Sequence, residues 1–327
     1  METKKVISIG ALNCDIIAFI TKFPEAEQKI NSVDYVPPKA SGVALDCVTM
    51  IKNLGCSCGH IGKMGDDEYA DIIERELTAD DLDCTYCWRV PEERSSLAWV
   101  MVNPSSGERC HIMHPMSEKG MFTIEEIERA GDYIRAARAV HMEMLQMPMA
   151  PLYRVAEMCS ESGVITSMDI DIAPRFLYEY RYSDPELLRK TLGKVDIIKL
   201  CKDAVADLTD ETDMEKAAES ILAEYGMRVL IITIGEKGCV AAWKQDGEIM
   251  STTVTGFELP DVRDTTGAGD AFQGGFLYGY LNGYPVEKAA RLGNACGYLK
   301  ARNIGARNMP DRETVESFLK TYGWESL

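Results

Sequence analysis

The sequence has 327 residues, of which 46% are hydrophobic and 27% are charged, and this composition predicts a chain folded throughout around a large core. Its 52 acidic and 35 basic side chains give a net charge of −17, which argues against nucleic acid as a partner. The N-terminal apolar stretch is too short for a signal peptide or a membrane span, and the eleven cysteines form no secretory disulfide pattern. We therefore expect a cytoplasmic protein that binds neither nucleic acid nor membranes.

Short apolar runs alternate with amphipathic helical patterns along the chain, and this alternation predicts βαβ units with a parallel sheet. In the first half the predicted elements are strand 6–9, helix 43–54, strand 58–62, helix 68–77, helix 124–137, strand 139–142, helix 151–162 and strand 164–169. The second half continues with helix 185–191, strand 195–198, helix 214–225, strand 229–234, a hairpin of strands 238–244 and 248–254, and helices 271–281 and 286–302. We expect one doubly wound, mostly parallel α/β domain over residues 1–327.

Two stretches, at about 12–40 and 95–115, interrupt this rhythm with strand-like sequence. They are far apart in the chain, but they can pair into one small β sheet that forms a lid beside the main domain. The alternative is two unrelated surface excursions, and periodicity alone leaves both open.

The most informative segment is residues 264–272, Asp-Thr-Thr-Gly-Ala-Gly-Asp-Ala-Phe, in which a glycine-rich turn leads directly into a helix. An acidic chain must bind phosphate through backbone N–H groups, helix N-termini or a metal, and the N–H groups of Gly267, Ala268 and Gly269 can form such an anion hole. Asp270 would repel a phosphate there unless it accepts a hydroxyl proton during phosphoryl transfer. The alternative is an Asp270 that only caps the helix.

Further motifs follow the same order as in a known family. They are Gly10-x-x-Asn13-x-Asp15, the glycine segment 62–69, Thr233-x-Gly235-x-Lys237-Gly238, Asn294 and Gly305-Ala306. Together with residues 264–272, they resemble the ribokinase/PfkB carbohydrate kinases over essentially the whole chain. The resemblance implies a Rossmann-like (ribokinase-like) sheet with a small β lid, an active site at their junction, and ATP and Mg²⁺ as cofactors.

The resemblance also implies roles for individual residues. Asp270 would be the catalytic base, and the backbone of Gly267, Ala268 and Gly269 would stabilise the transferred phosphoryl group. Substrate hydroxyls would contact Asn13, Asp15 and Gly42. The nucleotide would contact Thr233, Gly235, Lys237, Gly238, Thr266 and Asn294. Some members hold a monovalent cation such as K⁺ behind the anion hole, and here Asp264, Thr266 and the carbonyl groups of Ala301 and Ala306 would hold it.

One departure from the family lies in residues 41–46, Ser-Gly-Val-Ala-Leu-Asp. The family usually has two glycines here, followed after three residues by Asn, so Asp46 replaces a neutral amide by a carboxylate that only accepts hydrogen bonds. As a substrate contact, Asp46 favours hydroxyl or amine donors over a carboxylate or phosphate at that point. The alternative is a helix-surface Asp46 that never meets a ligand.

A second departure lies in residues 199–204, Lys-Leu-Cys-Lys-Asp-Ala, where the family commonly has Asn-x-x-Glu to help hold Mg²⁺ and phosphates. Neither of these two residues is present. Asp203 or Asp207 can replace the acid, and Lys202 can contact a phosphate directly as a point charge. Otherwise Mg²⁺ is held chiefly by ATP and water.

Two further segments carry candidate substrate ligands. Asp169-x-Asp171-x-x-x-Arg175 resembles the family's Asp-x-Asn-x-Arg segment at a strand end, so Asp171 is a candidate ligand, while Arg175 either contacts substrate or pairs with an acid. Arg109 lies on the expected lid and either reaches the substrate or is solvated.

These observations predict a phosphotransferase that phosphorylates a hydroxyl group of a sugar or sugar acid. A nucleoside kinase shares the fold and the Asp270 chemistry, but the lid segments have few aromatic side chains to stack on a base. A catalytically silent sugar-binding or regulatory protein is the other alternative, and the changed residues Cys201–Ala204 are its support. Exposed apolar lid residues, with Ile16, Ile17 and Phe19 expected among them, predict a homodimer formed through the lid.

Overall fold

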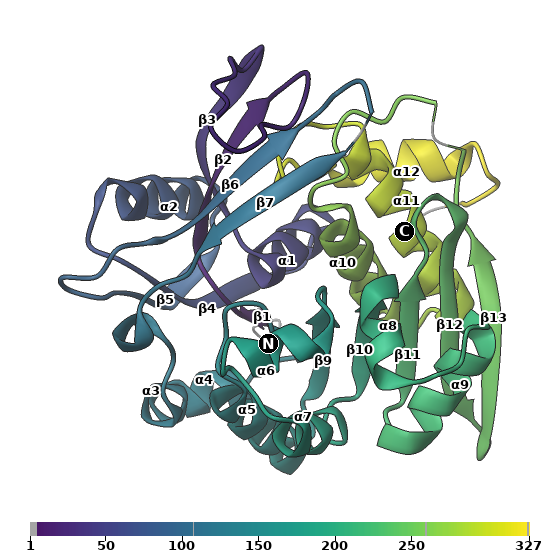
Figure 1. Ribbon diagram of the computed structural model, residues 1–327. Coiled ribbons are helices and arrows are strands. Elements are labelled where there is room, and N and C mark those ends of the chain that lie inside the picture. The colour runs from purple at the N-terminus through teal and green to yellow at the C-terminus, as the bar shows by residue number, and fades with distance from the viewer. Residues whose placement is uncertain (1–4, 107, 259, 326) are drawn as a thin grey trace.

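The computed structural model describes residues 5–106, 108–258, 260–325 and 327. Within them, nine strands form one sheet in the order β13-β12-β11-β10-β9-β8-β1-β4-β5 (Figure 1). These strands are β1 (Val6–Ile9), β4 (Cys58–Met64), β5 (Asp83–Arg89), β8 (Ala139–Glu143), β9 (Ile165–Ile170), β10 (Ile197–Cys201), β11 (Val229–Thr233), β12 (Gly238–Gln245) and β13 (Glu248–Thr255). Neighbours from β5 to β11 are parallel, whereas β12 and β13 form an antiparallel hairpin at one edge. The expected α/β fold with a mostly parallel sheet is confirmed.

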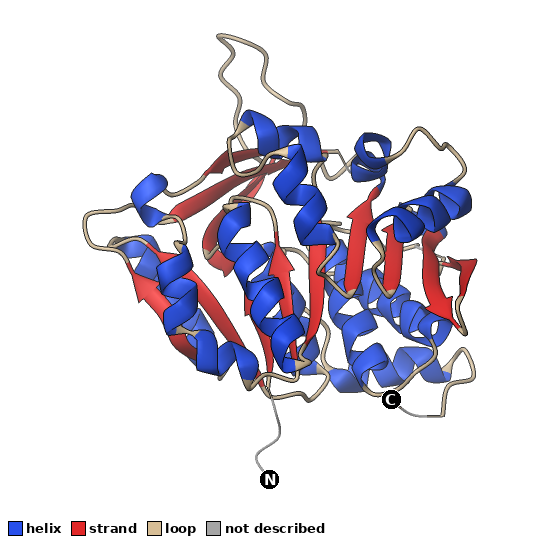
Figure 2. Cartoon of the chain, turned by 90° about the horizontal axis from the view of Figure 1, so that it is seen from below, coloured by secondary structure: helices blue, strands red, loops and turns tan. Residues whose placement is uncertain are grey.

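Helices cover both faces of this sheet (Figure 2). One face packs against α1 (Val43–Asn53), α2 (Glu68–Ala79), α10 (Ala268–Leu281) and α11 (Val286–Ala301). The other packs against α3 (Ile124–Arg129), α4 (Gly131–Arg135), α5 (Met149–Ser162), α7 (Pro185–Leu192), α8 (Lys202–Leu208) and α9 (Met214–Tyr225). The strands alternate between the two cores: Ile231 of β11 joins the first, whereas Leu230 and Ile232 join the second. Apolar residues on both faces explain why the central strands read as continuous apolar runs.

Some elements differ from the sequence prediction. The helix expected over 124–137 is divided into α3 and α4 at Ala130, and β5, α6 (Pro174–Glu179), α8 and α12 (Arg312–Lys320) were not predicted. β5 is an edge strand whose residues are partly buried or exposed. Tyr86 and Trp88 pack against one core and Cys84 and Cys87 against the other, so its sequence has no simple alternation of apolar and polar residues. Among the described residues, every helix is too short or too polar to span a bilayer.

A smaller sheet, called the lid sheet below, lies beside the main one (Figure 1). It has the order β3-β2-β6-β7 and consists of β2 (Asn13–Phe19), β3 (Asp34–Ser41), β6 (Ser96–Val102) and β7 (Arg109–His114). Its register places Asp15, Ala98 and Met113 in one row across three strands. All three line the cleft described below.

The opposite face of the lid sheet carries the row Ile16, Trp99 and Ile112. Trp99 is 49% exposed and Ile112 is 56% exposed. The prediction that Ile17 and Phe19 are exposed is wrong, because both are buried on the face that carries Asp15. Side chains alternate along a strand, so only every second apolar residue of β2 can reach the outer face.

Candidate active site

A cleft of about 690 Å³ opens between the lid sheet, the first turn of α10 and the carboxyl ends of β9, β10 and β11. Carboxyl ends of parallel strands are the usual place for ligands in open α/β sheets. The lid sheet contributes Asn13, Asp15, Ala98, Arg109, His111 and Met113 to its lining. Segments that are distant in the sequence therefore meet around one space.

The turn before α10 forms one wall of this cleft. Gly267 precedes the helix with a left-handed backbone (φ 80°), and a Cβ atom there would lie 2.2 Å from the carbonyl oxygen of Ala306. Glycine is therefore required on both conformational and steric grounds. The Ala268 N–H donates to the Thr265 carbonyl oxygen at 3.1 Å, which leaves the N–H groups of Gly267 and Gly269 to serve an anion, with the helix dipole behind them.

Asp270 lies on the first turn of α10, lines the cleft and is only 7% exposed. One oxygen from each of Asp169, Asp171 and Asp270 lies within 4.8 Å of the others. Burial raises the pKa of Asp270 well above its usual value, and the charges of Asp171, Asp46 and Asp169 raise it further, against the opposing charge of Lys199. A carboxyl group of this kind is suited to take a proton.

Lys199 supplies the positive charge among these carboxylates. It lies on β10, is 1% exposed, and its Nζ lies 2.8 Å from Asp169 Oδ1 and 3.1 Å from Asp171 Oδ1. The contact with Asp171 is a hydrogen bond that Lys199 donates, whereas that with Asp169 is a close charge contact. Burial opposes the charge of Lys199, but Asp169, Asp171 and Asp270 together raise its pKa. Parallel pairing of β9 and β10 sets Lys199 directly opposite Asp169.

The part of the cleft next to the lid sheet presents hydrogen-bond acceptors. Asp46, on α1, is 1% exposed and accepts a hydrogen bond from Ser41 Oγ at 3.0 Å. Asp46 Oδ1 and Asn13 Oδ1 are buried without a partner among the described residues. Burial raises the pKa of Asp46 to about 8 and that of Asp15 to about 7. Unpaired buried acceptors are costly, so they favour a ligand that brings donors.

Glu143, at the end of β8, is a site residue that sequence reasoning missed. Its carboxylate accepts hydrogen bonds from the backbone N–H groups of Ala11 and Ala44, each at 2.6 Å. These bonds hold the β1–β2 connection and the first turn of α1, the two segments that carry Asn13 and Asp46. Burial raises the pKa of Glu143 to about 8. A lone acidic residue at the end of an apolar strand is the signal that could have identified it.

Only some of the residues predicted to contact the nucleotide lie together in the cleft. Thr233, Gly235, Gly238, Thr266 and Asn294 line the cleft, together with Glu236, Phe257 and Tyr298. Asn294 Nδ2 donates to the carbonyl oxygens of Val254 and Thr255 at 3.0 and 3.2 Å. Lys237 and Lys202 are exposed and lie outside the lining of the cleft.

The remaining predicted residues are placed as follows. Gly42 and Asp171 line the cleft, as do Ala301 and Ala306 behind the anion turn, whereas Asp264 lies buried beneath that turn. Arg109 donates a hydrogen bond from Nη1 to Thr265 Oγ1 at 2.6 Å, which joins β7 to the anion turn. Arg175 pairs with Asp207.

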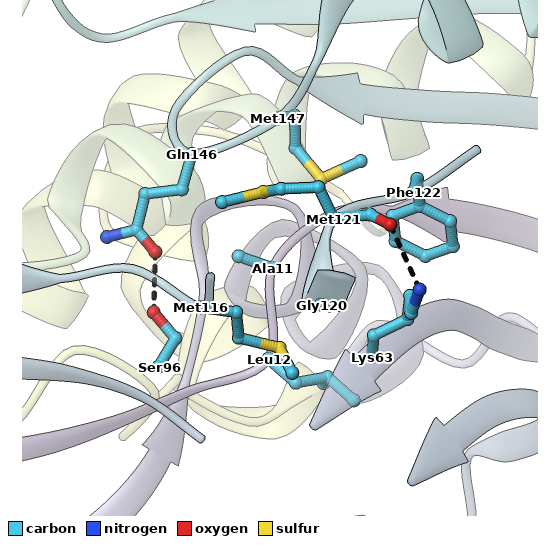
Figure 3. Close-up of a pocket in the computed structure, with 10 residues that line it drawn as sticks. All are labelled: Ala11, Leu12, Lys63, Ser96, Met116, Gly120, Met121, Phe122, Gln146 and Met147. Carbon is cyan, nitrogen blue, oxygen red and sulfur yellow. Dashed lines mark hydrogen bonds between the residues drawn. The ribbon is translucent and has the colours of Figure 1, made fainter. Parts of the chain in front are cut away.

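A second, far smaller pocket lies behind the β1–β2 connection (Figure 3). Its volume of about 20 Å³ can hold no more than about one water molecule. Ser96 Oγ donates to Gln146 Oε1 at 2.5 Å on one side, and Lys63 Nζ donates to the Met121 carbonyl oxygen at 3.0 Å on the other. Methionine side chains fill most of the space between them, so this pocket is not a second ligand site.

Comparison with known proteins agrees with this geometry. Residues 3–313 match the model of the pfkB family carbohydrate kinases. The chain belongs to the pfkB family. It is accordingly a kinase, a phosphotransferase with an alcohol group as acceptor, of the carbohydrate and nucleoside kinase type.

Two curated relatives and one solved structure illustrate the match. The chain is 29% identical to fructokinase-2 of Oryza sativa subsp. japonica, covering 93% of this chain and 90% of the relative. It is 26% identical to an ATP-dependent ribose-1-phosphate kinase of Halopiger xanaduensis, covering 96% and 98%. The structure of Arabidopsis thaliana ribokinase complexed with ribose and ATP superposes with a TM-score of 0.77 at 22% identity, covering 97% of this chain and 99% of that one. The last comparison supports the fold.

This chain lacks the two residues of the family's Asn-x-x-Glu that commonly help to hold Mg²⁺, and its other acidic residues do not replace them. At the positions of the family's Asn-x-x-Glu, Cys201 lines the cleft with a thiol in place of the amide, and Ala204 is an apolar, buried residue. Asp203 is exposed on α8, and Asp207 is engaged by Arg175. The carboxylates that do cluster, at Asp169 and Asp171, already hold the Lys199 ammonium. The described residues at these positions therefore offer no free magnesium ligand.

Proposed function

We propose that this chain transfers the γ-phosphoryl group of ATP to a hydroxyl group of a sugar, with Asp270 as the general base. The observation that carries the proposal is a buried Asp270 on the first turn of α10, facing a cleft that is also lined by the glycine-rich turn. This arrangement places a proton acceptor and an anion hole around one reacting centre.

The chemistry follows from these groups. The substrate hydroxyl gives its proton to the Asp270 carboxylate while its oxygen bonds to the γ-phosphorus. The bond from this phosphorus to the β–γ bridging oxygen breaks, and ADP leaves. Charge on the oxygens of the transferred group is stabilised by the N–H groups of Gly267 and Gly269 and by the N-terminus of α10. Lys199 counters the negative charge that Asp169 and Asp171 place next to the base.

The lining of the substrate side favours a sugar over a nucleoside. The lid sheet contributes Asn13, Asp15, Ala98, Arg109, His111 and Met113, and none of these described residues is Phe, Tyr or Trp. A nucleobase would gain most from an aromatic partner. Asp15, Asp46 and Asn13 instead offer oxygen acceptors that match sugar hydroxyl groups. The acceptors give a sugar acid less support than a neutral sugar, because its carboxylate would meet other carboxylates.

The test is ADP release from ATP with Mg²⁺ over a panel of neutral sugars, amino sugars, sugar acids, polyols and nucleosides. We expect turnover with a sugar and its loss in Asp270→Asn, with sugar binding retained by calorimetry. Turnover confined to nucleosides would replace the proposed substrate class. Sugar binding without turnover in the unaltered protein would identify a catalytically silent binder.

We further propose a cytoplasmic homodimer that forms through the outer face of the lid sheet. The row Ile16, Trp99 and Ile112 is apolar; Trp99 and Ile112 are exposed and Ile16 is partly buried. An exposed apolar sheet face favours a partner. The eleven cysteines are all free thiols, which suits a reducing compartment. Light scattering should find a dimer that Trp99→Glu converts to a monomer. The exposed apolar residue Met250, on β13 of the main sheet, supplies the control Met250→Glu, which should leave the dimer intact.

A further inference from the structure

Lys300 is a fully buried lysine behind the anion turn. It lies in the last turn of α11 and its side chain is 0% exposed. Lysine is almost never buried to this extent unless its charge is compensated. Lys300 Nζ donates hydrogen bonds to two backbone carbonyl oxygens, that of Asp264 at 3.2 Å and that of Asn303 at 3.1 Å. The ammonium group therefore bridges the start of the anion turn and the loop that follows α11.

These two segments are held together at the same place by other bonds. Asp264 Oδ1 accepts from the Thr266 N–H at 2.9 Å, and Asp264 Oδ2 accepts from the Gly305 N–H at 2.8 Å. The Asp264 N–H itself donates to the Ala301 carbonyl oxygen at 3.1 Å. Lys300 is thus part of the framework that fixes the anion turn, and it adds a positive charge to it.

Nearby carboxylates support the charged form of Lys300. Burial lowers the pKa of its ammonium group, whereas the charges of Asp264, Asp46 and Asp270 oppose this decrease. Two carbonyl acceptors satisfy most of the N–H donors as well. A buried ammonium with carbonyl acceptors and acidic neighbours is the compensated arrangement that a buried charge requires.

A monovalent cation does not fit beside this lysine. The resemblance to the pfkB family predicts such an ion at Asp264, Thr266 and the carbonyl groups of Ala301 and Ala306. A potassium ion at a protein site is held by a shell of oxygen atoms, backbone carbonyls above all. Here the carbonyl oxygen of Asp264 already accepts a hydrogen bond from Lys300. So does the carbonyl oxygen of Asn303, which lies in the loop after α11 together with Ala306. An ion among these oxygens would meet the ammonium at close range, where two positive charges repel.

We propose that the Lys300 ammonium takes the place of a monovalent metal ion in this kinase. It is a tethered cation that fixes the anion turn and places positive charge behind the N–H groups of Gly267 and Gly269. The protein is then independent of K⁺. The consequence for catalysis rests on the proposed kinase function, whereas the claim about the ion site does not.

The first experiment measures thermal unfolding in KCl and in tetramethylammonium chloride at equal ionic strength, because tetramethylammonium is too large to enter the site. The unaltered protein should have the same Tm in both salts. Lys300→Ser should lower Tm by roughly 5–10 °C in tetramethylammonium chloride. KCl should restore at least half of this loss, since the shorter side chain leaves room for a metal ion among the carbonyl oxygens.

A matched control is available in Lys63, which is also buried and also donates to a backbone carbonyl, that of Met121. It lies beside the small pocket, away from the anion turn. Lys63→Ser should lower Tm equally in both salts. Restoration of both variants by KCl would show a general salt effect and overturn the proposal.

The second experiment does not depend on a stable variant. Crystals of the unaltered protein soaked in thallium(I) should have no anomalous peak within the shell formed by Asp264 and Asn303, and crystals of Lys300→Ser should have one. A peak in the unaltered protein, or an unaltered Tm that rises in KCl, would overturn the proposal. ADP release by the unaltered enzyme should likewise be equal in the two salts. Absence of any ADP release would count against the proposed kinase function. The Tm values and the thallium anomalous peaks would still decide whether Lys300 replaces the ion.

Discussion

Two groups of carboxyl groups lie at the same cleft, and they differ in how their charge is balanced. At the carboxyl ends of β9 and β10, Asp169 and Asp171 enclose the Lys199 ammonium, and Asp270 lies next to them. Next to the lid sheet, Asp15 and Asp46 have no ion pair among the described contacts, and Asp46 Oδ1 has no hydrogen-bond partner there. The first group is partly balanced within the protein, by one ammonium group among three carboxyl groups, and is suited to chemistry. The second is unbalanced, and a ligand with donors can balance it.

Substitution of the base should have the largest effect. Asp270→Asn keeps the shape of the side chain but cannot accept the hydroxyl proton, so kcat should decrease by about 10²–10⁴-fold. Steady-state ADP release measures this loss. Because burial disfavours the charged carboxylate, Tm should stay the same or increase. A variant that keeps more than about a tenth of the activity would contradict the role of Asp270 as the general base.

The effect of the Lys199 charge on Asp270 should be visible in the pH profile of kcat/KM. Asp270 must be deprotonated to act, and its raised pKa makes kcat/KM decrease as the pH falls through that pKa. Lys199→Met removes the charge that lowers the pKa of Asp270, so the acid limb should move to higher pH by about one unit. Lys199→Arg keeps the charge and should retain the position of the limb.

Lys202 provides the control for this experiment, because it is a neighbouring but exposed lysine. Lys202→Met should leave the acid limb where it is. A loss of activity in Lys202→Met as large as that in Lys199→Met would favour the earlier prediction that Lys202 contacts a phosphate group.

Asp15 and Asp46, the group without an ion pair, should lower the stability of the folded protein. Substitution in this group should affect turnover less than substitution of Asp270 or Lys199. Burial raises the pKa of Asp46 from 3.8 to about 8, so the folded state binds a proton that the unfolded state has released. The free energy of unfolding should therefore decrease as the pH rises from about 4 to about 8. Asp46→Asn should remove part of this decrease and gain about 1–3 kcal/mol above that range.

Urea unfolding at a pH below and a pH above this range measures the difference. The exposed residue Asp203 supplies the control, since Asp203→Asn should leave the slope with pH unchanged. An Asp46→Asn variant with the slope of the unaltered protein would show that the Asp46 carboxylate is already balanced.

The sequence predicted the parts of this site that are local in the chain. The turn and base at residues 267–270 lie in one segment, and glycine, small residues and a carboxylate at a helix start have a direct physical meaning. The sequence allows two interpretations of Asp46, a substrate contact or a helix-surface residue, and in the structure Asp46 lines the cleft. The alternation of apolar runs likewise predicted the sheet, because each central strand is buried on both faces.

The remaining features depend on contacts between distant segments. Lys199 becomes part of the site only because the register of β9 and β10 sets it opposite Asp169. The sequence pattern predicts Lys202 as the phosphate contact instead. Lys300 resembles an ordinary lysine near a helix C-terminus, yet α11 turns it inward to carbonyl oxygens that lie 36 and three residues away. No local pattern separates a buried lysine of this kind from a solvated one.

The Glu143 carboxylate has a mechanical consequence. It holds Ala11 and Ala44 by their backbone N–H groups, and the chain enters the lid sheet just after the first and leaves it just before the second. Both passages of this segment between the two sheets are therefore fixed to the carboxyl end of β8. One side chain of the main sheet thus sets where Asn13 and Asp46 lie relative to Asp270.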